Sequence, residues 1–379
     1  MTDVQRVSAT HSIANSPLFL RATTASTVAA SGCVDAAVEC VDPGQLPDWD
    51  SSLAAHPQGS IFHSGAWASV LESTYGYKPR YFTVRQDGAF RSLLPLMEVD
   101  SCLTGRRGIS LPFTDECEPL SADPESFKNL VKNALAHGRE RNWKYVEFRG
   151  GRKLFGDVPA SLAFYSHEVD LNGGEEVLSN RVDSSVRRAI KKAEKTGVTV
   201  ETSSGLEGVR IFYSLLCRTR KKHGMPPQPF SFFRNIHQHI ISRNLGIVVL
   251  ARYEGRPIAA AVYFGLGTRA IYKYGASDET FQHLRGNNLV MWEAIKWHAQ
   301  RGFKTLSLGR TSLGNEGLRR FKLGWGASEV RSEYVKYDLR NDCFLADKDE
   351  SSGWHNQVFR RLPVFVSRMI GAGLYRHWA

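Results

Sequence analysis

The two halves of the chain repeat one order of secondary-structure signals, and this repeat limits the folds that the chain can adopt. In the first half, residues 81–97 alternate like two strands around the turn Asp87-Gly88. A helical pattern then covers about 125–141, and residues 143–149 alternate like a strand. An Asp-Gly pair between alternating runs is a strong hairpin signal. The first half therefore predicts a hairpin, a helix and a further strand.

The second half gives the same signals in the same order. Residues 247–264 read as a hairpin around a Glu-Gly turn, and 269–275 read as a third strand. A helix that begins at Asn287 ends at Gly302, and 303–308 follows as a strand. The segments NWKYVEFRG and GFKTLSLGR, which close the two halves, are similar enough to indicate a duplication. We predict an α/β (α+β) fold of two tandem domains, each with a mixed β-sheet flanked by helices.

We expect four parts along the chain. Residues 1–35 contain few charges and few large apolar side chains, which predicts a disordered leader. The N-terminal domain covers 36–172, and the C-terminal domain, which carries the catalytic motifs, covers 173–345. Residues 346–379 form a basic amphipathic tail.

Composition sets outer limits on function. Of 379 residues, 42% are hydrophobic and 23% are charged, as in soluble globular proteins. The formal net charge of +11 favours anionic partners such as phosphorylated ligands, nucleic acid or the inner membrane surface. The six cysteines form no C-x-x-C pair, so we expect no metal site and a reduced, cytoplasmic setting. No run of 18 apolar residues is present, which argues against a membrane-spanning helix.

Charged, amidic and glycine residues gather around the strand at 303–308. Asn287 and Asn288 open the preceding helix, Gly309-Arg310 follows the strand, and the block GLRRFKLGWG ends at residue 326. In α/β proteins, ligands commonly bind at the ends of strands. This arrangement resembles the C-terminal core of the FemAB and BioF2-like branch of the GNAT-fold acyltransferases, of the type associated with envelope and exopolysaccharide systems. The likeness covers roughly residues 57–336.

The resemblance implies roles for residues of this block. It places Lys322 to stabilise the oxyanion of acyl transfer, or to bind a substrate phosphate, and it makes Arg310 a clamp for an anion. We expect Asn287, Asn288 and Trp325 to contact substrate. From the sequence alone, a lysine next to two arginines is more often ordinary surface charge.

Two tyrosines precede the asparagine pair. Tyr272 and Tyr274 are alternate residues of one predicted strand, so we expect them to share a face of the sheet. One of them could donate a proton to a leaving group. Packing between strand and helix explains them equally well, and no carboxylate or histidine is selected as a general base.

A basic helix is predicted over 182–196, with an apolar stripe on one side and Gly197 beyond its end. Its cations are candidates for a phosphate-binding surface, because guanidinium groups bind phosphates through two hydrogen bonds. The residues expected to bind substrate are Arg187, Arg188, Lys191 and Lys192. The alternative is a solvated outer face.

The acyl donor is left open by the sequence. GNAT enzymes that use coenzyme A carry [Gln/Arg]-x-x-Gly-x-[Gly/Ala], whose backbone N–H groups hold the pyrophosphate at a helix N-terminus. Residues 282–288 keep one glycine, with asparagine where a small residue is expected. This departure favours a bulkier donor, and the Fem relatives use aminoacyl-tRNA.

We therefore predict an N-acyltransferase that forms an amide on an amine acceptor in cell-envelope, peptidoglycan or exopolysaccharide biosynthesis. No cofactor is expected to be bound permanently. The acyl donor is a co-substrate, either aminoacyl-tRNA or an acyl thioester of coenzyme A or a carrier. The expected partners are an anionic or phosphorylated substrate and tRNA as a possible donor, but not DNA. The alternatives are a coenzyme A- or carrier-thioester-dependent acyltransferase and a non-catalytic binding module for a phosphorylated polymer.

The C-terminal residues 358–378 combine apolar residues at helical spacing with four arginines. Pro363 suits the first turn of a helix. Such a segment can lie at the surface of an anionic membrane, which would make the protein peripheral at the inner face of the cytoplasmic membrane. The alternative is a helix that packs its apolar face on the second domain.

Overall fold

The computed structural model describes residues 37–121, 123–346 and 362–378. The predicted leader lies outside these residues, as does most of the first half of the predicted tail. The strands are β1 (Glu39–Val41), β2 (Lys78–Gln86), β3 (Ala89–Val99), β4 (Arg107–Ser110), β5 (Leu120–Ser121), β6 (Tyr145–Phe148), β7 (Leu162–Asp170), β8 (Thr199–Ser203), β9 (Gly246–Tyr253), β10 (Arg256–Leu266), β11 (Arg269–Ser277), β12 (Thr305–Ser312), β13 (Ser328–Asp338) and β14 (Cys343–Leu345). The α-helices are α1 (Trp49–Ala54), α2 (Gly65–Tyr75), α3 (Pro124–Glu140), α4 (Gly174–Arg181), α5 (Ser184–Lys195), α6 (Leu206–His223), α7 (Phe230–His239), α8 (Gly286–Gln300), α9 (Glu316–Leu323) and α11 (Val364–Leu374).

The predicted repeat is present in the sheet. In the first half, β2, β3 and β4 are antiparallel neighbours, α3 follows, and β6 returns parallel to β4. In the second half, β9, β10 and β11 are antiparallel neighbours, α8 follows, and β12 returns parallel to β11. Both halves therefore have the β-β-β-α-β order, and the predicted mixed α/β fold is confirmed.

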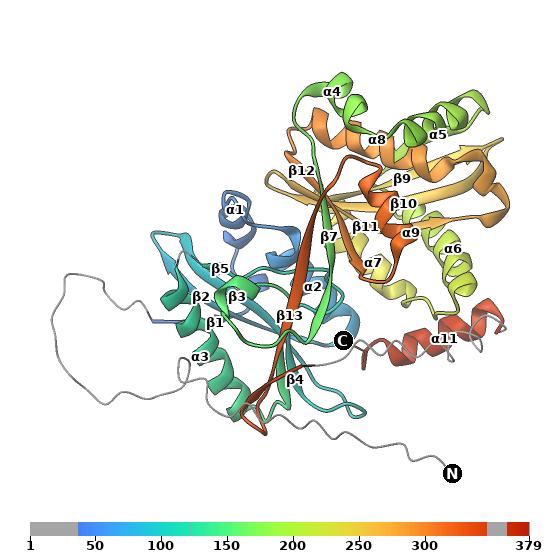
Figure 1. Cartoon of the computed structure of the whole chain (residues 1–379). Coiled ribbons are helices and arrows are strands. Elements are labelled where there is room, and N and C mark those ends of the chain that lie inside the picture. Colours follow the sequence, from blue (N-terminus) through green and yellow to red (C-terminus); the bar gives the residue numbers. More distant parts are fainter. Residues whose placement is uncertain (1–36, 122, 347–361, 379) are drawn as a thin grey trace, which may run out of the picture. The chain divides into compact units, whose positions relative to one another are not determined.

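Two long strands that the sequence did not reveal join the halves. Strand β7 belongs to the first half in sequence but pairs with β12, and β13 follows β12 in sequence but pairs with β6. The two strands also pair with each other and run side by side between the strands of the two halves (Figure 1). The described strands thus form one fourteen-stranded sheet in the order β1-β2-β3-β4-β6-β13-β7-β12-β11-β10-β9-β8, with β5 and β14 at its side.

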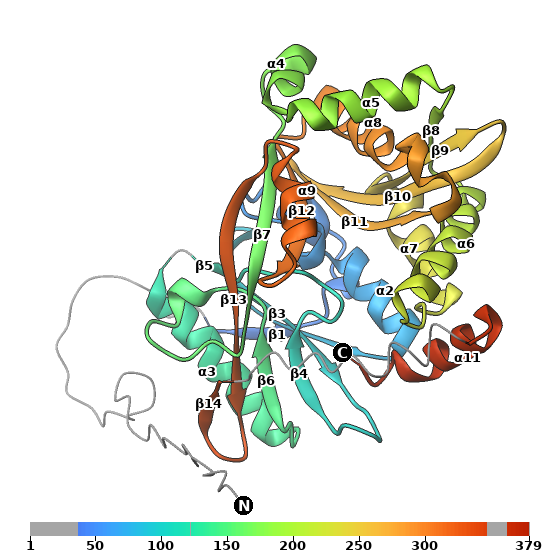
Figure 2. The same cartoon turned by 45° about the vertical axis from the view of Figure 1, so that its right-hand side comes forward.

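Helices lie on both faces of this sheet (Figure 2), and apolar cores fill the space beneath them. The central core is shared, because it contains Trp67 and Leu93 from the first half and Phe232 and Val262 from the second. Outside the second half, α5 and α8 cover a separate core that includes Trp325. Outside the first half, residues of α3 pack with β6 and β13. The shared core and the exchanged strands hold the halves together.

Local signals set several helix ends as predicted. Asp123 caps α3 by accepting a hydrogen bond from the Ser126 N–H, and Pro124 occupies its first turn. Gly197, just beyond α5, has φ +85°, which glycine adopts without strain. The loop expected after Arg310 is different: strand β12 continues to Ser312, and residues 316–323 form α9. Asn315 caps this short helix by accepting from the Leu318 N–H.

Candidate functional site

A loop of the first half, residues 111–119, reaches the strands of the second half. Its backbone is held by Arg149, whose Nη1 donates to the Leu111 carbonyl at 3.0 Å. The Cys117 N–H donates to the Arg149 carbonyl at 2.6 Å. From β13, the buried Tyr334 hydroxyl donates to the Asp115 carbonyl. These bonds fix Asp115 beside β11 and β12.

Lys273 of β11 is aimed at Asp115 by a β-bulge. Opposite β10, Val262 faces Tyr274 and Tyr263 faces Tyr272, so Lys273 is an extra residue in the ladder. Its Nζ donates to Asp115 Oδ2 at 3.0 Å, and its side chain is buried. Lys273 therefore forms a buried ion pair between the two halves.

Lys322 and Arg310, both predicted from the sequence, lie at the same place. Lys322 is only 4% exposed, and its Nζ donates to the carbonyls of Gly309 and Arg310 at 2.8 and 2.9 Å. Arg310 lies with its Nε 4.0 Å from Asp115 Oδ1, and its Nη1 donates to the Tyr334 hydroxyl at 3.1 Å. The interpretation of Lys322 as surface charge is wrong, because α9 lies against β7 and β12 and buries this side chain.

The charges of this cluster shift one another. Burial would raise the pKa of Asp115, but Lys273, Arg310 and Lys322 outweigh it and hold the pKa below its usual range. Burial lowers the pKa of Lys322 to about 8, with Arg310 adding to the effect and Asp115 opposing it. Burial likewise lowers the pKa of Lys273. Three cations around one carboxylate leave an excess of positive charge in a partly buried place, which suits an anion or a developing negative charge.

A pocket opens beside Asp115 and Gly309, between the loop, β7, β11 and β12. Strands β11 and β12 pair only from Arg269 to Ile271, which leaves this side of the sheet open. The polar residues that line the pocket are Gln58, Ser60, His63, Asp115, Glu116, Glu118, Ser166, Glu168, Arg269 and Ser307.

Two carboxyl groups of the 111–119 loop, those of Glu116 and Glu118, line this pocket. Glu116 accepts from the hydroxyls of Ser166 and Ser332. Glu118 accepts a hydrogen bond from the Gly151 N–H at 2.6 Å. Burial of the Glu118 carboxyl, together with the nearby Glu116, raises its pKa to about 7. The residue as a whole is exposed. Burial lowers the pKa of His63 to about 4, so the imidazole is neutral near pH 7. The pocket thus offers both charged and neutral polar groups to a substrate.

The predicted placement of the two tyrosines is wrong, and the bulge at Lys273 is the reason. Tyr274 points into the shared central core, whereas Tyr272 packs on the opposite face against the core under α8. Burial raises the pKa of Tyr272 to about 12 and raises that of Tyr274 still further. Lys273, between them, is the residue that reaches the site.

Trp325 also differs from its expected place at the substrate. The side chain is 0% exposed and lies in the core beneath α5 and α8, where its ring meets Phe321 edge-on. Its apolar surroundings explain the position, because a large aromatic ring gains most when it is fully removed from water. Trp325 supports the end of α9 by packing.

The basic helix α5 is confirmed as a helix, but it lies on the other face of the sheet, over the core of α8. Arg187 is used within the protein: its Nη1 donates to the carbonyls of Ser179 and Val182 at 2.9 and 2.7 Å and so holds the end of α4. Arg188, Lys191 and Lys192 are exposed. The structure does not bring these four residues to the cluster around Asp115.

Asn287 and Asn288 lie in the first turn of α8, beside Arg285, which has the left-handed conformation at φ +61°. Asn287 donates from its side chain to the Ser277 hydroxyl at 3.2 Å, and Gly286 lies close against Ile258. The pair therefore marks a helix N-terminus that is separate from the buried cluster.

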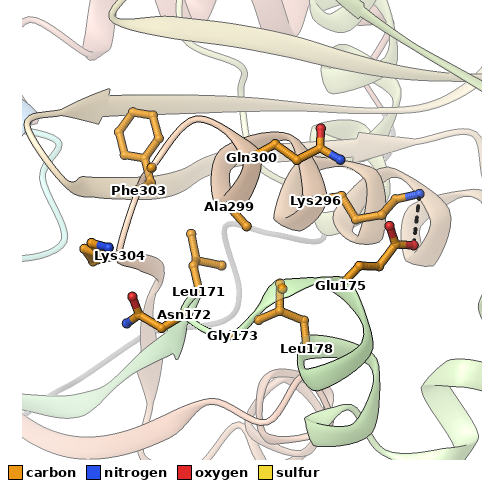
Figure 3. Close-up of a pocket in the computed structure, with 12 residues that line it drawn as sticks. Leu171, Asn172, Gly173, Glu175, Leu178, Lys296, Ala299, Gln300, Phe303 and Lys304 are labelled. Atoms are coloured by element: carbon orange, nitrogen blue, oxygen red, sulfur yellow. Dashed lines mark ion pairs between the residues drawn. The ribbon is translucent and has the colours of Figure 1, made fainter.

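Another pocket lies at the surface between the segment that follows β7 and the end of α8 (Figure 3). Leu171, Leu178 and Phe303 line it, and Lys296 and Glu175 form an ion pair of 3.8 Å at one side. It contains none of the residues predicted from the motifs. We assign it no role in the reaction.

Sequence reasoning missed Asp115, Lys273 and Tyr334. A signal existed for two of them: three acidic residues stand within 115–118, and Lys273 is a charged residue in the middle of an otherwise apolar strand. Tyr334 carried no signal, because β13 was not recognised. Among the described residues, no group of three or more His, Cys, Asp or Glu side chains is arranged to hold a metal ion. The helices in the described part of the chain include none that is long and apolar enough to span a membrane.

Comparison with known proteins gives a consistent picture. Residues 180–329 match the family described as acetyltransferase (GNAT) domain. The lipid II:glycine glycyltransferases of Staphylococcus epidermidis and Staphylococcus aureus are 20% identical to the chain, over 73% of its length and 87% of theirs. The crystal structure of FemX has a TM-score of 0.64 at 15% identity and covers 80% of this chain and 98% of FemX. A tandem GNAT protein from the clavulanic acid biosynthesis pathway has a TM-score of 0.50 at 12% identity, with 80% and 99% covered.

The fold and the relatives define a GNAT-fold transferase of acyl or aminoacyl groups. The similarity to the glycyltransferases and the fold shared with FemX agree with the FemAB-like resemblance of the block that ends at Gly326. Transferases of this class use their donor as a co-substrate.

Proposed function

We propose that the protein forms an amide bond by transferring an aminoacyl or acyl group to the amine of a cell-envelope precursor. The names of its relatives, glycyltransferases that act on lipid II, favour an aminoacyl donor and a peptidoglycan precursor as acceptor. Exopolysaccharide precursors are the other acceptors expected from the sequence. In each case the acceptor is anionic or phosphorylated, which agrees with the net charge of +11.

The observation that carries this proposal is the partly buried cluster in which Lys273, Arg310 and Lys322 surround Asp115. When an amine attacks a carboxylic ester or thioester, the carbonyl oxygen becomes an oxyanion. A preorganised N–H donor in a partly dry site lowers that barrier by about 3 to 4 kcal/mol. Lys322 Nζ has two of its three N–H groups on backbone carbonyls, and in this proposal the third donates to the oxyanion.

The reaction balances without an added oxidant or metal. The amine nitrogen attacks the carbonyl carbon, the bond to the leaving oxygen or sulfur breaks, and the new C–N bond remains. The amine loses one proton and the leaving group takes up one. Asp115 is a weak base because its pKa is lowered, so its part in the proposal is to orient Lys273 and the cationic cluster.

Two classes of acyl donor are proposed. Aminoacyl-tRNA fits the relatives and the exposed cations of α5, namely Arg188, Lys191 and Lys192. A thioester of coenzyme A or a carrier fits the N-terminus of α8, where Asn287 and Asn288 occupy the first turn. The proposed roles of Tyr272, Tyr274 and Trp325 in substrate contact receive no support, because all three side chains pack in apolar cores. Arg187 instead lines a surface pocket together with Lys191 and Trp292.

One experiment separates these donors and tests the activity. Purified protein is incubated with a lipid-linked muropeptide acceptor and with either aminoacyl-tRNA or an acyl-coenzyme A. The mass of the acceptor is then measured by mass spectrometry. The expected product is heavier by one aminoacyl or acyl residue, and Lys322→Met gives about 100-fold less of it. No product from either donor class, with wild-type protein that is folded, would contradict an amide-forming activity on this acceptor.

The proposed acceptor also sets a location. A lipid-linked precursor is reached from the cytoplasm at the inner face of the membrane, so we propose a cytoplasmic enzyme with peripheral membrane contact.

A further inference from the structure

Helix α11 is fixed to the protein by one of its faces. Gly371 lies so close to the Pro227 carbonyl that a Cβ atom would stand 2.0 Å from that oxygen. The Tyr375 hydroxyl donates to the Pro226 carbonyl at 3.1 Å, and Tyr77 donates to the carbonyls of Tyr375 and Arg376. The packing that we considered as an alternative to membrane binding is therefore present, but it uses only this face.

The opposite face of α11 carries large apolar side chains into the solvent. Phe365 and Met369, four residues apart, are 65% and 72% exposed, and Trp378 beyond the helix end is 52% exposed. The stripe continues onto the neighbouring helices α6 and α7, because Phe365, Arg368 and Met369 border a hollow with Tyr213 and Phe230. Exposed apolar side chains gathered in this way mark a contact surface.

The charges on this surface have one sign. Residues 362–378 contain Arg368 and Arg376 and no Asp or Glu, and residues 225–234, which supply Phe230, also contain no acidic residue. Arg368 lies over the Tyr213 ring at 5.3 Å, so its guanidinium is at the rim of the apolar stripe. Figure 2 shows α11 at the outside of the described chain, beyond α6 and α7.

We propose that the exposed face of α11, defined by Phe365, Arg368 and Met369, docks on the surface of an anionic lipid bilayer together with Trp378 beyond the helix end. Apolar side chains enter the headgroup boundary, Trp378 suits the interface because its ring is amphipathic, and the arginines meet anionic headgroups. Since the packed face fixes the helix, the apolar stripe is presented without a folding step. The charge complementarity selects a membrane rather than a second copy of this chain, whose equivalent surface is equally positive. This proposal deepens the peripheral contact proposed above by naming its surface.

Vesicle flotation tests the surface and needs neither donor nor acceptor. The full chain is mixed with vesicles of phosphatidylcholine containing about a third phosphatidylglycerol, or of phosphatidylcholine alone, at low and at high salt. We expect binding to the anionic vesicles that weakens at high salt. The double variant Phe365→Ser/Met369→Ser should lower the partition coefficient more than about tenfold. Arg368→Gln/Arg376→Gln should lower it roughly 10- to 30-fold at low salt, since each cation contributes about fivefold.

Matched variants make the outcome decisive. Val330→Ser removes a side chain of similar exposure, 61%, from β13 and should bind vesicles like wild type. All variants should keep the wild-type melting temperature, because the replaced side chains are exposed. The proposal is overturned if wild type stays with the soluble fraction at low salt, or if Phe365→Ser/Met369→Ser binds as tightly as wild type. It is also overturned if that variant abolishes a concentration-dependent dimer and vesicles bind neither protein. If the wild-type protein binds anionic vesicles but transfers no acyl group, the proposed activity is contradicted and the proposed membrane surface is not.

Discussion

At the scale of single residues, Lys322 is a buried lysine that we propose to take part in the reaction. It is nearly inaccessible, and its ammonium is held by the carbonyls of Gly309 and Arg310. Lys322→Met keeps much of the volume and removes the charge, so turnover should fall about 100-fold while the fold is kept. Lys322→Ala should in addition lower the free energy of unfolding by about 2 to 4 kcal/mol, because it leaves a cavity and two unpaired carbonyls.

Steady-state kinetics and urea unfolding check both numbers. Lys132→Met, which replaces an exposed lysine on α3, is the control and should match wild type in both assays. Turnover of Lys322→Met within a factor of about two of wild type would remove this residue from the reaction.

The lowered pKa of Lys322 gives opposite pH dependences for activity and stability. Oxyanion stabilisation needs the ammonium form, so turnover should fall as the pH rises through about 8. In the unfolded chain, lysine keeps its proton to about pH 10.4. Between these values the unfolded state binds more protons than the folded state, so the contribution of Lys322 to the free energy of unfolding rises with pH. The comparison is wild type against Lys322→Met at pH 7 to 10. A turnover that is flat to pH 10 would show that the ammonium is not required.

The ion pair between Asp115 and Lys273 couples the two halves through side chains. Lys273→Met alone leaves the partly buried Asp115 carboxylate with fewer partners and should lower the free energy of unfolding by about 1.5 to 3 kcal/mol. Asp115→Asn combined with Lys273→Met should recover part of this loss, because neither buried charge then remains. A double-mutant cycle by urea unfolding measures the coupling. The exposed pair Lys128–Glu125 is the control, with an expected coupling below about 1 kcal/mol. Additive effects at Asp115 and Lys273 would contradict a direct pair.

At the scale of elements, α5 has two kinds of basic residue. Arg187 closes the end of α4 through backbone carbonyls, so Arg187→Gln should lower the free energy of unfolding by about 1 to 2 kcal/mol. The triple variant Arg188→Gln/Lys191→Gln/Lys192→Gln should leave stability within about 0.5 kcal/mol and weaken binding of aminoacyl-tRNA. The slope of log binding constant against log salt concentration should become less steep by about 0.7 to 0.9 for each phosphate contact that is lost.

Filter binding at several salt concentrations, together with thermal unfolding, distinguishes these residues. An unaltered affinity and salt slope in the triple variant would mean that this face of α5 is only solvated. If Arg187→Gln has the melting temperature of wild type, the hydrogen bonds of Arg187 to the end of α4 do not contribute to stability.

At the scale of the whole molecule, the exchange of β7 and β13 makes each half incomplete without the other. A chain cut between 172 and 173 separates β7 from β12, which then exposes an unpaired strand edge. We expect residues 38–172 and 173–379 to be insoluble when produced singly and to form a soluble complex when produced together, since the cut falls in an exposed loop. Solubility and size-exclusion chromatography check this. Two monomeric fragments, each with its own cooperative unfolding transition, would contradict the exchange.

The sequence alone determined what depends on neighbours along the chain. Both hairpins, the helices α3, α5 and α8 and the strands β6, β11 and β12 followed from periodicity, turn residues and caps. Strand β4 of the first half was not predicted. The resemblance gave the class of enzyme, and Lys322 and Arg310 lie together at one place in the structure as two residues of one motif.

Only the tertiary structure decided what depends on pairing between distant segments. Residues of β7 and β13 pair across more than 150 positions, and no local pattern encodes which edge a strand joins. The bulge at Lys273 places Tyr272 and Tyr274 on opposite faces of the sheet, because one extra residue shifts the alternation of a strand. Asp115 reaches Lys273 only because the halves share a core, and Trp325 is buried only because α9 packs against the second sheet. Burial and electrostatic shifts arise from the sum of these contacts, so they exist only in the folded chain.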